Sequence, residues 1–94
     1  MIPVDVHVSV RVGLSCFDAE INLHLHAVPR VDEWFEPIVD SDVVQVRSVF
    51  HYCDGSIRLF LDDLKYAASS ANIDELAVAF IDAGCKVSDI VREE

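Results

Sequence analysis

Residues 4–12 read VDVHVSVRV, with a valine at every even position from Val4 to Val12. The residues between these valines are all polar: Asp5, His7, Ser9 and Arg11. β-Branched side chains that recur with a period of two are typical of a half-buried strand. We therefore expect residues 4–12 to form a strand with one aliphatic face and one polar face.

A second alternation follows in residues 19–27 and predicts a partner strand. Its apolar positions are Ala19, Ile21, Leu23, Leu25 and Ala27, and its polar positions are Glu20, Asn22, His24 and His26. We expect an antiparallel hairpin with its loop inside residues 13–18. Two registers remain open, with Val12 opposite either Ala19 or Phe17. Both registers bury the same alternate residues, because they differ by a shift of two.

A second hairpin is predicted from residues 43–53 and 56–61, joined by Asp54-Gly55. This dipeptide favours a two-residue type I′ turn. That turn places Phe50 opposite Leu59 and Val49 opposite Phe60. The predicted core face holds Val44, Val46, Phe50, Tyr52, Ile57, Leu59 and Leu61. The predicted opposite face holds Gln45, Arg47, His51, Arg58, Val49 and Phe60.

The remaining residues favour helices. Leu64, Ala67, Ala68 and Ala71 fall on one stripe of a first helix. A second helix should be capped by Asn72 and end at Gly84. Its apolar face would hold Ile73, Leu76, Ala77, Phe80 and Ile81. Ser88 could cap a last short turn that runs to Val91.

These elements predict an α+β fold in one domain, residues 1–94. It would have an antiparallel sheet of about four strands, made of two β-hairpins, followed by two to three C-terminal helices packed on one face. The length of 94 residues, the 52% hydrophobic content and the mean hydropathy of +0.32 exclude a disordered chain.

Seventeen acidic residues against seven basic ones give a net charge of −10. This balance argues against direct nucleic-acid binding and against an anionic membrane surface, because both depend on Lys and Arg. It favours a basic protein surface as the partner.

The cysteines are Cys16, Cys53 and Cys85, an odd number without a CxxC pair. The first residues lack the basic and apolar regions of a signal peptide. We therefore expect a soluble, reduced, cytoplasmic protein without disulfides. Its cysteines should be small buried or half-buried hydrophobic residues.

The polar face of the first hairpin suggests a metal site as the less favoured of two interpretations. His7, His24, His26 and Asp5 are residue types that ligate Zn²⁺. We prefer a solvated strand face without a metal, because the ligand geometry depends on an open register. Cys53 with His51 and Arg58 suggests a cysteine nucleophile, again as the less favoured interpretation. We prefer a structural role for Cys53. We expect no catalytic residues, no cofactor and no enzyme activity.

The connection at residues 29–42 is the most distinctive segment. It holds five acids and no base after Arg30, with two aromatic residues among them: Asp32, Glu33, Trp34, Phe35, Glu36, Asp40 and Asp42. We expect a loop with one helical turn at residues 31–35. Its aromatic side chains either fold back onto the core or anchor a partner, with the acids steering association.

These features favour a small, acidic, non-enzymatic interaction module. It would occlude a basic surface of a partner protein, as inhibitors, immunity proteins and antitoxins do, with partial mimicry of nucleic acid. One alternative is a metal- or small-molecule-binding module that uses the face of His7, His24 and His26. Another is a structural subunit of a homo-oligomer, such as a homodimer, joined through Val49 and Phe60 or through a sheet edge.

Overall fold

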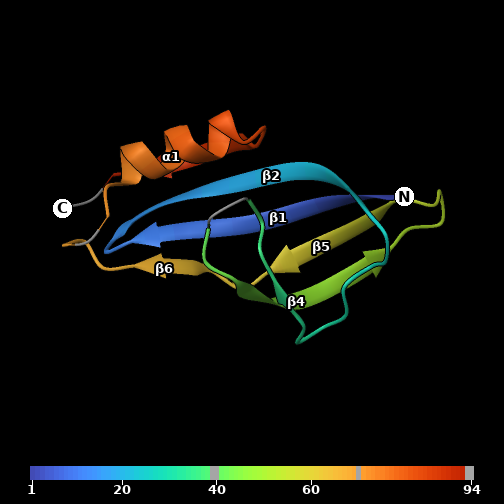
Figure 1. Ribbon diagram of the computed structural model, residues 1–94. Coiled ribbons are helices and arrows are strands. Elements are labelled where there is room, and N and C mark those ends of the chain that lie inside the picture. The colour runs from blue at the N-terminus through green and yellow to red at the C-terminus, as the bar shows by residue number, and fades with distance from the viewer. Residues whose placement is uncertain (39–40, 70, 93–94) are drawn as a thin grey trace.

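The computed structural model describes residues 1–38, 41–69 and 71–92, which form seven strands and one helix (Figure 1). The strands are β1 (Ile2–Val12), β2 (Ser15–Leu25), β3 (Trp34–Phe35), β4 (Val44–His51), β5 (Ile57–Leu61), β6 (Leu64–Tyr66) and β7 (Lys86–Val91). The helix is α1 (Ile73–Asp82).

The strands form one mixed sheet in the order β3-β4-β5-β1-β2-β7, and β6 also pairs with β1. β1 runs parallel to both β5 and β6, while the other pairs are antiparallel. The predicted α+β fold, with a four-stranded antiparallel sheet and two to three helices, is therefore wrong. Two segments expected to be helical are strands that complete the hydrogen bonding of the first hairpin.

The first hairpin pairs β1 with β2 along their whole length. Val12 lies opposite Ser15, and the loop is only Gly13 and Leu14. Gly13 has φ 59°, a left-handed conformation that glycine adopts without steric cost. Both predicted registers are wrong by an even number of residues. The aliphatic face is nevertheless the predicted one, and we call it the inner face of the sheet; the face with Asp5, His7, Ser9 and Arg11 is the outer face.

β6 stands where the first predicted helix would have begun. β5 pairs with β1 only at residues 5–7, so residues 10–12 of β1 need another partner on that side. Residues 64–66 supply it, and the Gly13 amide donates to the Tyr66 carbonyl at 3.2 Å. Because buried backbone groups must be paired, this need outweighs the helical propensity of the alanines that follow.

β7 replaces the short C-terminal turn that was predicted after Ser88. It pairs with the free side of β2, from Glu20 opposite Lys86 to Cys16 opposite Val91. The pairing has an irregularity between Cys16 and Asp18, and Asp89 on β7 has φ 54°. The predicted helical turn is wrong because the residues after Gly84 complete an edge of the sheet.

Both predicted ends of α1 are confirmed. The Asn72 side chain accepts hydrogen bonds from the amides of Asp74 (2.9 Å) and Glu75 (3.2 Å). At the other end Gly84 has φ 99° and donates to the Ile81 carbonyl, while Cys85 donates to the Phe80 carbonyl. These two bonds form a Schellman motif that ends the helix.

The second hairpin differs from its prediction in turn and register. The Gly55 amide donates to the Tyr52 carbonyl, and the Tyr52 amide donates to the Ser56 carbonyl, so the loop has three residues. Phe50 therefore lies opposite Arg58 rather than Leu59, and Val49 lies opposite Leu59.

A bulge in β4 then reverses part of the predicted core face. The register shifts between Val46 and Ser48, so residues on the two sides of the bulge alternate out of phase. Val44 and Val46 are buried as predicted, but Phe50 and Tyr52 are exposed. Val49, predicted on the opposite face, packs against the core instead.

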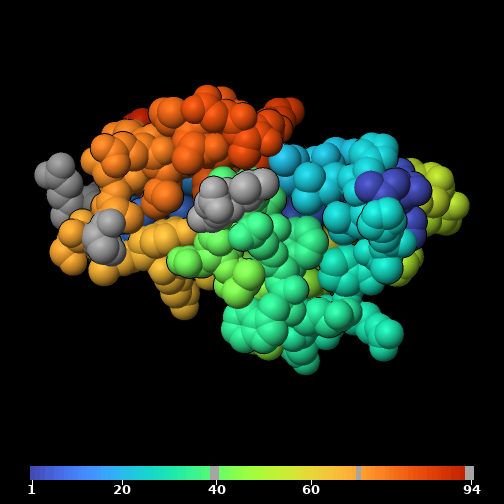
Figure 2. All heavy atoms as spheres, in the orientation of Figure 1, coloured from blue at the N-terminus to red at the C-terminus, as the bar shows by residue number. Residues whose placement is uncertain are grey.

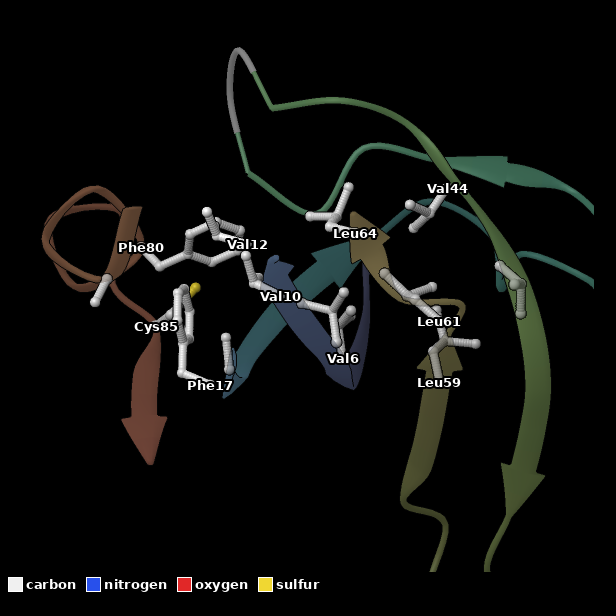
Figure 3. Close-up of a cluster of buried hydrophobic side chains, with 14 of the residues drawn as sticks. Val6, Val10, Val12, Phe17, Val44, Leu59, Leu61, Leu64, Phe80 and Cys85 are labelled. Atoms are coloured by element: carbon white, nitrogen blue, oxygen red, sulfur yellow. The ribbon is translucent and has the colours of Figure 1, made fainter. Parts of the chain in front are cut away.

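The core lies between the inner face of the sheet and two covers, α1 and the loop that precedes β4 (Figures 1 and 3). Phe80 of α1 meets Phe17 of β2 edge to face, with ring centroids 5.5 Å apart. Leu59, Leu61 and Leu64 fill the other half of the core. The predicted burial of Ile81 on α1 is wrong, because its side chain is 53% exposed.

The three cysteines are all free. Cys85 is buried, which raises the pKa of its thiol, and Cys16 is partly buried. Cys53 is exposed at the tip of the second hairpin, so the prediction of burial is wrong for this residue. Within the described residues no helix is both long and apolar enough to cross a membrane.

Candidate protein-interaction surface

The loop of residues 28–38 covers the inner face of the sheet beside α1. Val28, Phe35 and Ile38 pack against the core, and Pro37 is buried. The predicted helical turn at residues 31–35 is absent from this described segment, which contains a turn at residues 31–32 and then β3. The length of the connection is thus explained by its role as a second cover for the core.

The two aromatic residues of this loop have different environments. Phe35 lies opposite Val44 and packs against the core, as expected if the loop folds back. Trp34 lies opposite Gln45, on the outer face, and its side chain is 66% exposed. Of the two predicted anchors, only Trp34 is available to a partner.

The acids of the loop do not form one cluster. Asp32 and Glu33 lie beside the start of β4, where the Glu33 carboxylate accepts a hydrogen bond from the Arg30 amide at 2.7 Å. Glu36 and Asp42 lie on the other side of the loop, toward α1. Asp40, also predicted to bind a partner, lies outside the described residues.

An apolar groove of about 440 Å³ separates this loop from α1. Ile21 and Leu23 of β2 form its floor, Pro37 and Ile38 form one wall, and Ala79 and Ala83 form the other. In Figure 2 the orange helix, the cyan end of β2 and the green loop come together on this side of the molecule.

A second hollow of about 340 Å³ adjoins the groove and shares Ile38 and Ala79 with it. Asp42 and Tyr66 also line this hollow. Burial raises the pKa of the Tyr66 phenol, and the nearby carboxylate of Asp42 raises it further. The phenol therefore stays neutral beside a negative charge.

The charged side chains that line the groove and its adjoining hollow are acidic, namely Glu36 and Asp42. Residues 31–38 and 41–42 on the loop, and residues 73–83 on the helix side, contain no Lys, Arg or His. The further acids of these segments do not line the groove: Asp74, Glu75 and Asp82 on the helix, and Asp32 and Glu33 on the far side of the loop. Asp74 is paired with Arg92 at 2.7 Å. We call the apolar groove with its adjoining hollow and these walls the acidic groove.

Sequence reasoning found the loop but missed the helix wall and the β2 floor. Val78 and Ile81 are 56% and 53% exposed on α1, outside the face that packs against the sheet. Neither of them lines the groove, whose helix wall is made of Ala79 and Ala83, so the sequence holds no apolar signal for that wall.

The histidines are spread along the first hairpin. His7 lies opposite Glu20, whereas His24 lies opposite Pro3, four residues further along β1, or about 13 Å. Asp5 accepts a hydrogen bond from Asn22 at 2.9 Å. Among the described residues no group of three or more His, Cys, Asp or Glu side chains could hold a metal ion.

His7 lies instead at a hollow of about 300 Å³ on the outer face. Its ring stacks on Phe60 with centroids 4.8 Å apart, and its Nδ1 lies 3.9 Å from the Glu20 carboxylate. Its Nε2 is buried without a hydrogen-bond partner. The neighbouring Ser9 hydroxyl donates to the Asp18 carboxylate at 2.6 Å.

The suggested nucleophile group at the second hairpin is also not assembled. His51 lies opposite Ile57 rather than Arg58. The Arg58 guanidinium instead lies over the Tyr52 ring, 5.2 Å from its centroid. Cys53 is in the loop, where Asp54 accepts hydrogen bonds from the amide and hydroxyl of Ser56.

The exposure of Trp34 gives a direct prediction. Trp34→Ala should change the free energy of unfolding by less than about 0.5 kcal/mol, as is usual for a surface side chain. Because Trp34 is the sole tryptophan, intrinsic fluorescence reports on it alone. We expect red-shifted emission in the free protein and efficient quenching by acrylamide. Blue-shifted emission protected from the quencher would show that Trp34 packs onto the core.

In comparisons with known proteins, no family model, no curated protein and no solved structure matches this chain.

Proposed function

We propose that this chain is a non-enzymatic interaction module whose acidic groove binds a basic segment of a partner protein. One observation carries the proposal: an apolar floor lies between two described walls, and the charged side chains that line the groove and its adjoining hollow, Glu36 and Asp42, are acids. Such a surface fits a partner segment that presents apolar side chains flanked by Lys or Arg.

The two parts of the acidic groove have different roles in binding. The apolar floor of Ile21 and Leu23 supplies affinity, because burying an apolar anchor in a fitting pocket removes its surface from water. Glu36 and Asp42 at the rim mainly steer a cationic partner toward the groove and set its orientation. The net charge of −10 extends this attraction over the whole molecule.

The biological consequence we propose is occlusion. A module that covers a basic surface blocks whatever that surface normally holds, including nucleic acid, as an inhibitor, immunity protein or antitoxin would. The carboxylates of Glu36 and Asp42 on the loop wall support partial mimicry of a phosphate backbone. We further propose that it acts in a reducing compartment, the cytoplasm, which its three free cysteines support.

A titration with a synthetic amphipathic peptide of about 14 residues, with leucines and lysines at helical spacing, tests the groove. Amide shifts in ¹⁵N spectra should concentrate on residues 21–23, 36–38 and 79–83. Binding should weaken as salt rises from about 0.05 to 0.3 M, because the rim charges become screened.

Ala79→Arg places bulk and positive charge in the groove and should weaken peptide binding at least about tenfold, or about 1.4 kcal/mol. Val78→Arg is the matched control, because Val78 is the adjacent exposed residue of α1 and does not line the groove. Peptide binding by this control should remain within about threefold of that by the unaltered protein, since the same arginine then stands outside the groove. Equal losses in both variants, or shifts confined to the outer face, would contradict the proposed site.

A further inference from the structure

The basic side chains are segregated from the acidic groove. Five of the seven Lys and Arg residues lie on the outer face of the sheet: Arg11, Arg47, Arg58, Lys65 and Lys86. Arg11 and Lys65 lie opposite each other, Lys86 lies opposite Glu20, and Arg58 lies opposite Asp5. The two faces of the sheet therefore differ in the chemistry that they offer.

A row of aromatic rings crosses the same outer face. Phe60 meets Phe50 edge to face, with centroids 5.5 Å apart, and Phe50 lies 6.5 Å from Tyr52. Phe50 and Tyr52 are 48% and 43% exposed, and the Arg58 guanidinium lies over Tyr52. We call Phe50, Tyr52, Arg58 and Phe60 the cationic ridge.

This ridge has the chemistry that the acidic groove requires, namely exposed apolar side chains beside a guanidinium. We propose that a second copy of this chain is an occupant of the groove: the cationic ridge of one copy docks into the acidic groove of the next. The proposal rests on the proposed function, because it uses the same groove. Phe50 and Tyr52 would contact the apolar floor, and Arg58 would meet the rim carboxylate of Glu36.

The two surfaces lie on opposite faces of the sheet, which determines the geometry of assembly. A contact between two different surfaces is heterologous, so each pair of copies leaves one groove and one ridge free. Further copies add in the same way and give a ring or an open chain. A symmetric dimer through a sheet edge would instead use one surface twice; Val49 and Phe60 no longer share a surface, because Val49 packs against the core.

The net charge of each copy gives this contact a distinctive salt dependence. Two copies at −10 repel one another, and at about 0.01 M salt this repulsion extends over about 30 Å. At about 0.15 M it is screened beyond about 8 Å, whereas the apolar contact is unaffected. Self-association should therefore strengthen over this range, while binding of the leucine–lysine peptide weakens.

Complementation between two variants tests the proposal. Ala79→Arg removes the groove but keeps the ridge, and Arg58→Glu removes the charge of the ridge but keeps the groove. By sedimentation velocity at concentrations up to about 1 mM, each variant alone should be monomeric. An equimolar mixture should form a dimer and nothing larger, because the remaining surfaces are both altered. Lys65→Glu, a charge reversal elsewhere on the outer face, should assemble like the unaltered protein.

Any other outcome overturns the proposed docking between two copies of the chain. An unaltered protein that stays monomeric at about 1 mM and 0.15 M salt excludes it. A single variant that still dimerises alone shows a symmetric interface, and a mixture that stays monomeric shows that groove and ridge do not meet. If the leucine–lysine peptide still binds the groove in these cases, the proposed function stands. Loss of both peptide binding and self-association would overturn both proposals.

Discussion

Phe80→Ala is expected to lower the free energy of unfolding by about 3–5 kcal/mol, a large part of the roughly 5–15 kcal/mol typical of a domain. The Phe80 side chain is 1% exposed and packs edge to face on Phe17. In Figure 3 its ring lies between α1 and the valines at the end of β1. Its removal leaves a cavity where the helix meets the sheet.

Urea denaturation followed by circular dichroism measures this loss. Val78→Ala is the control on the same helix, because Val78 is 56% exposed and its truncation should cost less than about 0.5 kcal/mol. If Phe80→Ala does not fold, Phe80→Leu retains most of the buried surface and should show a smaller loss. Equal effects of truncation at the two positions would mean that α1 does not pack on the sheet through Phe80.

The alternation of residues 4–12 was sufficient to predict which side chains of the first hairpin are buried. A period of two determines the face of every residue, and shifts by two residues leave that face unchanged. It could not determine the register, which depends on the length of the loop. Gly13 allows a two-residue loop through its positive φ, and this places His7 opposite Glu20 rather than His24.

The second hairpin shows where the pattern misleads. Asp54 and Gly55 correctly predict the position of the turn, but the hydrogen bonds of Asp54 to Ser56 accompany a three-residue loop. The bulge near Arg47 has no signal in the alternation, because an extra residue changes the phase without changing the residue types. That bulge is the reason Phe50 and Tyr52 lie on the outer face, where they form part of the cationic ridge.

Only the loop side of the candidate site could be predicted from the sequence. The density of acids in residues 32–42 is visible in the sequence and identified the loop. The packing of Ile38 and the burial of Pro37 then separate Glu36 and Asp42 from Asp32 and Trp34. This division is a long-range effect, because it depends on how α1 and the loop share the inner face of the sheet.

The segment after β5 provides the second large stability prediction, and it distinguishes the strand from the helix that was expected there. Leu64 is 2% exposed and belongs to the core, so Leu64→Ala should lower the free energy of unfolding by about 2–5 kcal/mol. Lys65→Ala is the control, because Lys65 is the exposed neighbour within β6 and should cost less than about 0.5 kcal/mol.

Leu64 would be buried in either the observed strand or the helix expected from the sequence. Amide hydrogen exchange is therefore needed to distinguish the two structures. In β6, protection of residues 64–66 should come from their pairing with residues 10–12 of β1. A helix from residue 64 to 71 would also protect the amides of its later turns through bonds to carbonyls four residues earlier. Ala68 is exposed and follows the strand, so its amide should exchange rapidly. Slow exchange of Ala68 that persists in Leu64→Ala would show that the alanine stripe forms a helix, and that residues 10–12 of β1 pair with a different segment.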